Sequence, residues 1–364
     1  MRISRLNTGF AAAFLGISLL LGGCAQTEES QGAFDVSPEA AGKLKVAVTL
    51  FPYYDFVRQI AGDQVDLQMV IPAGMDSHSF EPTPADIRTI QHADVLISNG
   101  GTMEHWLDET LAALDTTSMT IVTMMDYVDA VEEEIVEGME DADHDHEHTH
   151  VYVAADHDHS GETPEEHAAH SYEEDTRSYV DHDGHEEEIE YDEHIWTSPV
   201  NAMKLVDVIG DTLAEADPAH ADTYHQGAEN YKKELEEIDS GFREVSANRK
   251  RNMIVMGDKF PFRYLADEYQ LDYRAAFSGC SSDTEPSAKT IAYLIDKVKE
   301  EQIPTVYYLE LSSHRVSEII GEETGAEPLL LHSCHNVTRA QFDAGVTYVQ
   351  LMRQNIENLR KGID

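Results

Sequence analysis

Residues 218–247 read PAHADTYHQGAENYKKELEEIDSGFREVSA and decide how the rest of the chain is arranged. Apolar side chains recur there at alternating spacings of four and three residues, the pattern of a helix that buries one face. They are Tyr224, Ala228, Tyr231, Leu235, Ile238, Phe242 and Val245. At about 1.5 Å per residue this helix is about 45 Å long. That length exceeds the diameter of a small domain, so we expect the helix to run across two lobes.

Short apolar runs alternate with helical segments on both sides of this helix. Strands are expected at 45–50, 65–71, 95–98, 253–256, 271–277, 305–309 and 328–331. Helices are expected at 53–61, 84–92, 103–114, 198–216, 262–269, 287–301, 313–324 and 342–360. Such alternation predicts an α/β fold with parallel sheets. The predicted organisation is an N-terminal lobe over 44–216, a linking helix over 217–249 and a C-terminal lobe over 250–364, with a cleft between the lobes.

The N-terminus has the pattern of an export signal. Arg2 and Arg5 precede an apolar run at 10–21, which is too short for a permanent membrane span and ends at Leu-Gly-Gly-Cys24. Leu-Gly-Gly-Cys resembles a bacterial lipobox, so we expect a signal peptide over 1–23 and a lipid on Cys24. The polar residues 24–43 then form a tether. The predicted location is the outer face of the cytoplasmic membrane, at the cell surface or in a periplasm.

A strongly acidic, histidine-rich run occupies residues 137–190. From Glu137 to Glu193 there are 22 acidic residues, one basic residue and ten of the 19 histidines. The formal net charge of −45 excludes nucleic acid as a partner. The run is too polar to fold on its own, and it is either a solvated loop or a collector of divalent metal. The accessory ligands we expect in it are His144, His146, His148, His150, His157 and His159.

Ligands of open α/β sheets bind beyond the carboxyl ends of the strands. Four loops at such positions carry metal-ligating side chains. The first holds His78, the second holds His194 after the acidic run, the third holds Asp258 beside Lys259, and the last holds His332. We expect these loops to converge on one cleft.

Two motifs resemble those of a known family. GMDSHSFEPTPAD at 74–86 is similar to G-x-x-P-H-x-[YF]-x-P-[ST]-x-x-D, with Ser77 where proline is usual, and DEHIWTSP at 192–199 is similar to D-P-H-x-W-x-x-P. The chain from Lys45 onward resembles the metal-binding solute-binding proteins of bacterial ABC importers (cluster A-I, family 9), most closely the zinc-uptake branch. The resemblance implies two lobes, a bridging helix and metal ligands at His78 and His194.

The C-terminal part departs from the family pattern. The family's third ligand is replaced by Lys259, which has no lone pair when protonated. The family's last ligand aligns with His332. The third position stays open, and water or a further side chain could complete the site. The candidate side chains are Asp258, Glu310 and His335.

Cys280 and Cys334 are the two cysteines beyond Cys24. An even pair in an exported protein indicates one disulfide. Thiolate ligation of zinc is the rival interpretation.

The resemblance implies a receptor that captures Zn²⁺ in the cleft and delivers it to the permease and ATPase of an ABC importer. Imidazole ligands favour zinc, and manganese is the alternative. We expect no catalytic residue, since no His-Glu-x-x-His motif of a zinc hydrolase occurs. We also expect the protein to be a monomer. The alternatives are a surface adhesin or metal buffer, in which the acidic run is the function, and a zinc hydrolase.

Overall fold

The computed structural model describes residue 34 and residues 42–139, 179–180, 186–187, 190–281 and 285–364. Gln31–Asp364 form one compact unit, so the predicted boundaries between lobes and linking helix stay a prediction. No helix in the described ranges is long and apolar enough to cross a membrane.

The N-terminal half contains a four-stranded parallel sheet. Its strands are β1 (Leu44–Val48), β2 (Val65–Met69), β3 (Val95–Ser98) and β4 (Thr120–Thr123), in the order β2-β1-β3-β4. The intervening helices are α1 (Phe51–Ala61), α2 (Pro84–Gln91) and α3 (His105–Ala112). The sequence did not predict β4, because this edge strand buries only Val122 and so lacks an apolar run.

The C-terminal half repeats this strand order. β7 (Met253–Val255) pairs with β9 (Asp272–Arg274), and β11 (Thr305–Tyr308) pairs with β12 (Glu327–Leu330), all in parallel. A parallel bridge between Met256 and Tyr307 joins the two pairs, which gives the order β9-β7-β11-β12. The connecting helices are α6 (Arg263–Tyr269), α7 (Ala288–Glu300) and α8 (Arg315–Thr324). A short parallel pair, β8 (Lys259–Phe260) with β10 (Phe277–Ser278), lies beside them. The predicted α/β fold with parallel sheets is therefore confirmed.

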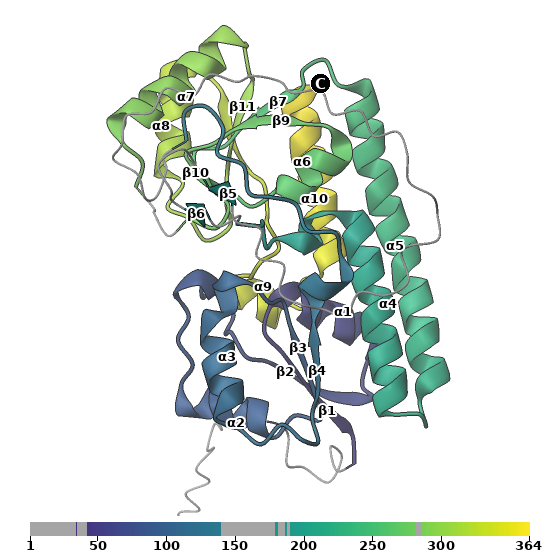
Figure 1. Cartoon of the computed structure of the whole chain (residues 1–364). Helices are drawn as coiled ribbons and strands as arrows, with labels where there is room; N and C mark the ends of the chain where they lie inside the picture. The colour runs from purple at the N-terminus through teal and green to yellow at the C-terminus, as the bar shows by residue number, and fades with distance from the viewer. Residues whose placement is uncertain (1–33, 35–41, 140–178, 181–185, 188–189, 282–284) are drawn as a thin grey trace, which may run out of the picture. The chain divides into compact units, whose positions relative to one another are not determined.

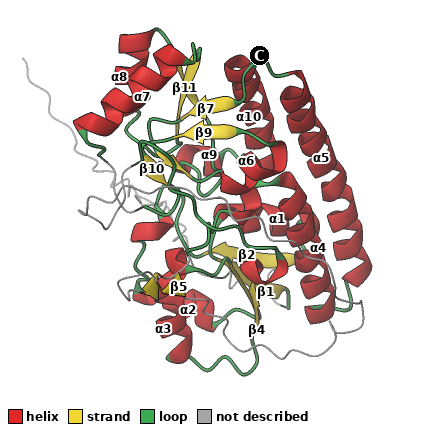
Figure 2. Ribbon diagram, turned by 45° about the horizontal axis from the view of Figure 1, so that its top comes forward, coloured by secondary structure: helices red, strands yellow, loops and turns green. Residues whose placement is uncertain are grey.

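The long helix is α5 (Ala221–Asn248), which follows α4 (Pro199–Ala216). All seven apolar positions of the predicted stripe are buried. α5 contacts α1 and α4 in the N-terminal half and α6 and α10 in the C-terminal half. Figures 1 and 2 show it running along one side of both groups of strands. The stripe is core packing, as its periodicity predicts.

The prediction of one continuous helix over 342–360 is wrong. The chain instead forms α9 (Arg339–Asp343) and α10 (Tyr348–Ile363). Gly345 at φ 71° interrupts the helix, and Thr347 caps the start of α10 by accepting from the backbone N–H of Gln350. The apolar periodicity continues across the break, which is why the sequence did not reveal it.

Asp55 fastens α1 to two other helices. Its carboxylate is fully buried and accepts hydrogen bonds from the Tyr231 hydroxyl of α5 at 3.1 Å and from the backbone N–H of Tyr348 at 2.7 Å. Arg58 pairs with the same carboxylate and donates to the carbonyl of Val346 at 2.7 Å. A buried carboxylate is stable when it is paired in this way. The start of α10 is therefore held against the N-terminal half.

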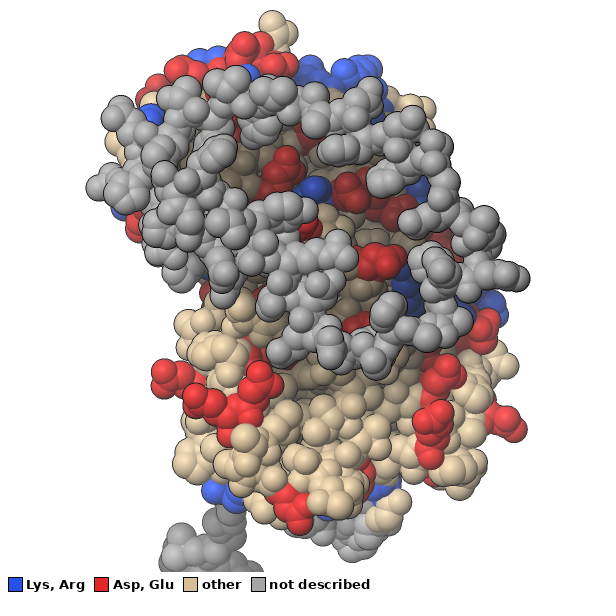
Figure 3. All heavy atoms as spheres, viewed as in Figure 1, with Lys and Arg blue, Asp and Glu red and all other residues tan. Residues whose placement is uncertain are grey.

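Four short 3₁₀ segments connect these elements: η1 (Ser77–Ser79), η2 (Thr102–Glu104), η3 (Met124–Tyr127) and η4 (Ile195–Thr197). Within the acidic run the structure describes one antiparallel pair, β5 (Tyr179–Val180) with β6 (Glu186–Glu187). On the face seen in Figure 3, acidic side chains outnumber basic ones, in line with the charge of the sequence.

Candidate metal centre

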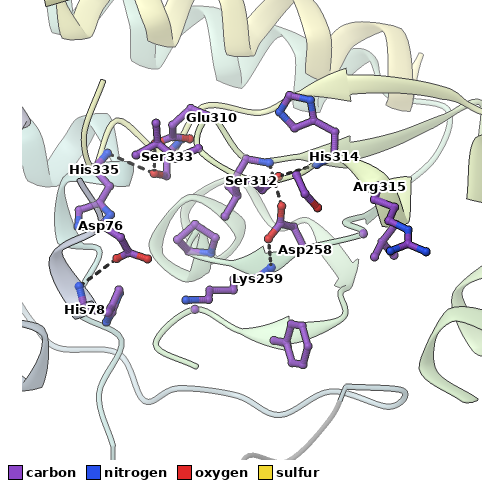
Figure 4. A pocket seen from close by; sticks show the side chains of 18 of the residues that line it. Asp76, His78, Asp258, Lys259, Glu310, Ser312, His314, Arg315, Ser333 and His335 are labelled. Atoms are coloured by element: carbon purple, nitrogen blue, oxygen red, sulfur yellow. Dashed lines mark hydrogen bonds between the residues drawn. The ribbon is translucent and has the colours of Figure 1, made fainter. Parts of the chain in front are cut away.

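One pocket of about 380 Å³ brings together loops from both halves of the chain. His78 and Asp76 from the first half face Asp258, Lys259 and His335 from the second half (Figure 4). His194 also lines it. The convergence of the loops after β2, β7 and β12 with the segment before α4 agrees with the placement expected of strand ends.

Three histidines form a triangle in this pocket. The ring centroids of His78 and His194 are 5.8 Å apart, those of His78 and His335 are 5.7 Å apart, and those of His194 and His335 are 6.0 Å apart. The two histidines of the family-like motifs are thus neighbours. The third member of the triangle is His335 and not His332.

His78 lies in η1, where Asp76 caps the segment. The Asp76 carboxylate accepts from the backbone N–H of His78 at 3.0 Å. Burial, the neighbouring His194 and the Lys259 ammonium together lower the pKa of His78 to about 4. The imidazole is therefore neutral at physiological pH, which is the form that binds a metal.

His194 is held by the carboxylate of Asp192. Nδ1 of His194 donates to this carboxylate at 3.2 Å, and the backbone N–H of His194 donates to it at 2.8 Å. Burial lowers the pKa of His194, but the nearby carboxylates of Asp192, Glu193 and Glu133 together outweigh this effect, and the pKa is raised overall. Because Nδ1 carries the hydrogen, Nε2 is the nitrogen left for a metal.

The structure does not place His332, which the sequence favours as a ligand, in the lining of this pocket. His332 is 1 % exposed and does not line the pocket. Asn355 of α10 binds its backbone N–H and its carbonyl, each at 2.7 Å, and Nδ1 accepts from the backbone N–H of Cys334 at 3.0 Å. Cys334 then adopts a left-handed conformation, φ 61°, which redirects the chain so that His335 faces the pocket. The sequence spacing could not reveal this turn.

His335 is positioned by residues from both halves. Its ring is stacked on Trp196, with 5.9 Å between centroids, and its Nε2 is hydrogen-bonded to the Ser77 hydroxyl. Ser77 occupies the place of the usual proline, which has no hydroxyl for such a bond. Asn336 donates to the carbonyls of Pro72 at 2.9 Å and Met75 at 2.8 Å. The loop carrying His335 is thus tied to the loop carrying His78.

Two carboxylates in the pocket wall were expected as alternative ligands. Asp258 accepts from the backbone N–H of Lys259 at 3.0 Å and from that of Leu309 at 3.4 Å. Glu310 accepts from the N–H of Ser333 at 2.9 Å and from its hydroxyl at 2.6 Å. Both carboxylates are therefore engaged by their own half of the chain.

The predicted disulfide is not formed. Cys280 and Cys334 are free thiols in the structure. Cys334 is fully buried beside His332, whereas the backbone N–H of Cys280 donates to the Glu133 carboxylate at 2.9 Å. Burial, with nearby carboxylates adding to it, raises the pKa of both thiols. A raised thiol pKa disfavours the thiolate, so the geometry supports neither the bridge nor thiolate ligation.

The triangle is slightly wider than a bound zinc ion requires. Zinc–imidazole bonds of about 2.0–2.1 Å, with about 1.1 Å from nitrogen to ring centre, place the centroids of tetrahedral ligands about 5.2 Å apart. The observed 5.7–6.0 Å exceeds this by about 0.5–0.8 Å. Accordingly, no three His, Cys, Asp or Glu side chains of the described part are already arranged to hold an ion. The rings have to close slightly, and His335 has to exchange its bond with Ser77 or use Nδ1.

Other predicted residues lie outside the described part of the chain. They are the lipidation site Cys24 and the accessory ligands His144, His146, His148, His150, His157 and His159.

Comparison with known proteins identifies the family. Residues 46–362 match the family described as zinc-uptake complex component A, periplasmic. The chain belongs to this family. The family is that of an uptake component and not of an enzyme, so the hydrolase alternative is set aside.

The relatives agree with this assignment. The chain is 30% identical over 327 residues to the zinc-binding lipoprotein AdcA of Streptococcus pneumoniae, covering 90% of this chain and 57% of that protein. It is 28% identical over 345 residues to the high-affinity zinc uptake system protein ZnuA of Bacillus subtilis, covering 95% and 94%. The Zn(II)-bound ZnuA-like domain of S. pneumoniae AdcA has a TM-score of 0.64 at 26% identity, covering 89% of this chain and all of that domain. The chain thus spans little more than half the length of AdcA.

Several residues that shape the site were given no role in it from the sequence. Trp196, Ser77, Asp192 and Asn336 contact a histidine or fix its loop. Asp192 and Trp196 stand inside the second motif, so the motif itself could have indicated them. Asn336 gave no signal, because its partners are carbonyl groups far away in the sequence.

Proposed function

We propose that this protein captures Zn²⁺ with His78, His194 and His335 and delivers it to an ABC-type importer. The convergence of these three imidazoles in one pocket is the observation that carries the proposal. Neutral imidazole suits zinc, and Mn²⁺, which prefers oxygen ligands, is the weaker cargo. The relatives' zinc binding supports the same choice.

Capture follows from the side chains as they lie. Asp192 orients His194 and makes its free nitrogen more basic, whereas burial keeps His78 neutral. Closing the triangle by about 0.5–0.8 Å around a zinc ion draws together loops from both halves. Widening it again weakens the site, which provides a route to release.

The partners and location follow the family. The proposed partners are the importer's permease and its ATPase, and the protein acts as a monomer. A lipid on Cys24 holds it at the outer face of the cytoplasmic membrane, with residues 24–43 as tether. The two halves act as lobes about the helix at 217–249. The acidic run at 137–190 raises the local metal concentration through its histidines.

Elemental analysis and metal titration of the purified protein test the proposal. We expect one tightly bound zinc ion and several weak ones, with manganese displaced by zinc. Deleting residues 140–185 should remove weak ions and keep the tight one, because the triangle lies outside the deleted segment. The double variant His78→Ala, His194→Ala should lose the tight ion. A tight ion retained in this variant would favour the metal-buffer alternative and contradict the proposal.

A further inference from the structure

Lys259 contributes an ammonium group to the pocket. Among the described residues no Asp or Glu lies within ion-pair distance of its side chain. Figure 4 shows this side chain extending across the pocket toward His78 and His335. An unpaired cation is notable in a chain with a net charge of −45.

Two carboxylates of the pocket wall, those of Asp258 and Glu310, are hydrogen-bonded within their own half of the chain. Asp258 binds two backbone N–H groups, and Glu310 binds the backbone and hydroxyl of Ser333. Three histidines therefore leave one position of a tetrahedral zinc ion to be filled. Lys259, when protonated, cannot fill it.

The pocket has room for more than the metal ion. Its volume of about 380 Å³ is more than ten times the roughly 30 Å³ that a water molecule occupies in the liquid. Beyond Lys259 it is lined by Ser312, Ser313 and Arg315, and Arg315 forms no ion pair with any residue that the structure describes. Hydroxyl, ammonium and guanidinium groups are the donors that recognise a carboxylate.

We propose that the protein binds its metal together with a small carboxylate, which ligates the ion through one oxygen and pairs with Lys259 through its charge. This inference rests on the proposed metal capture at His78, His194 and His335. In this arrangement Lys259 does not ligate the metal. It binds the carboxylate that serves as the metal's fourth ligand. The metal and the anion bind cooperatively, since each one neutralises charge that the other meets in the pocket.

The test measures zinc affinity of the full mature chain by competition with a chromophoric chelator, in sodium acetate or in sodium perchlorate at equal ionic strength. We expect acetate to tighten zinc binding about tenfold, within the range typical of two coupled ligands. Lys259→Met should abolish this effect, so that its zinc affinity is the same in both salts. Lys299→Met, at an exposed lysine of α7, is the matched control and should respond like the unaltered chain.

The outcomes separate the inference from the proposed function. Zinc affinity that is equal in both salts, or an acetate effect that persists in Lys259→Met, would overturn the inference and leave metal capture intact. Absence of one tight zinc ion in either salt would overturn both. A chain lacking residues 140–178 distinguishes the source of the carboxylate. If acetate tightens zinc binding only in that variant, the acidic run supplies the carboxylate in the full chain. This result would overturn the inference that a free small carboxylate binds there.

Discussion

The indole Nε1–H of Trp196 donates to the carbonyl of Ser333 at 2.8 Å, and this bond joins two loops that are 137 residues apart. Trp196 is fully buried, and its ring also lies 5.5 Å from that of His194 and 5.9 Å from that of His335. One side chain thus fixes the segment that carries the second histidine to the loop that carries the third. The position of His335 depends on this contact and not on sequence spacing alone.

Substitution of His335 should affect zinc affinity, whereas substitution of His332 should affect the stability of the fold. His335→Ala should weaken zinc binding by more than about 100-fold, because losing a ligand costs more than losing a residue that orients one. His332→Ala should leave zinc affinity unchanged but lower the free energy of unfolding by about 1–3 kcal/mol, since the backbone N–H of Cys334 loses its buried acceptor. Zinc titration and chemical denaturation measure the two effects.

His225→Ala is the control for both variants, because His225 lies on the surface with its side chain 54% exposed and pairs with an Asp211 that is 73% exposed. It should change neither quantity. A loss of the tight zinc ion in His332→Ala with the fold intact would return the ligand role to His332.

Asp192→Asn should alter both the affinity for zinc and its dependence on pH. Asn cannot hold Nδ1 of His194 as a carboxylate does, so affinity should fall by about 10–100-fold above neutral pH. In the unaltered chain the pKa of His194 is raised, so a proton competes with zinc there first as the pH falls. Below that pKa affinity should drop by about tenfold per pH unit, with His78 adding a second proton only near pH 4.

In Asp192→Asn this pH window should move to lower values, because burial lowers the pKa of His194 and the Asp192 carboxylate no longer opposes it. Zinc titrations across pH 5–8 measure the shift. The exposed Asp343→Asn in α9 serves as control. An unchanged window in Asp192→Asn would show that Asp192 does not set the protonation of His194.

Glu104 should make the protein less stable as the pH rises. Its carboxylate accepts from the backbone N–H groups of Asn99 and Gly100, both at 2.9 Å, yet burial raises its pKa from 4.5 to about 7. The folded state therefore binds more protons than the unfolded state between these values. The contribution of Glu104 to the free energy of unfolding is fully present below pH 4.5. It falls by about 3 kcal/mol as the pH rises to about 7.

Glu104→Gln should remove this component, because the amide does not titrate. Denaturation of the metal-free chain at several pH values from 4.5 to 8 measures it. A slope that is the same in the variant and the unaltered chain would assign the pH dependence to other groups.

Gly227→Ala tests the packing of the long helix. A Cβ at this position would lie 2.1 Å from the backbone carbonyl oxygen of Ile60 in α1. Alanine normally stabilises a helix by about 1 kcal/mol relative to glycine, but the clash requires α1 and α5 to separate. We expect a net loss of about 2 kcal/mol, as in other overpacked sites.

Gly241→Ala on the same helix is the matched control. Its Cβ would meet only the side-chain Cδ1 of Ile356, which can rotate away, at 2.7 Å. Its stability should stay within about 1 kcal/mol of the unaltered chain. Equal losses in the two variants would mean that the contact between α1 and α5 is not specially close.

The sequence by itself determined the fold class and most of its elements. The apolar stripe of α5, the strand runs and the two histidine motifs each follow from local patterns, because burial imposes a period on one segment at a time. The same reasoning placed His78 and His194 at the ends of elements that meet. It missed β4 and the break between α9 and α10, where burial is slight or the period continues.

Only the tertiary structure decided which histidine lies in the pocket with His78 and His194. It also decided that Cys280 and Cys334 are free thiols and that Lys259 lines the pocket. Spacing favours His332, and the presence of His335 in the pocket instead depends on the left-handed Cys334 and on Asn355 of α10. Cys280 and Cys334 lie in different surroundings that no local pattern records. These outcomes arise from contacts between residues far apart in the chain, and such contacts form only when both halves are folded.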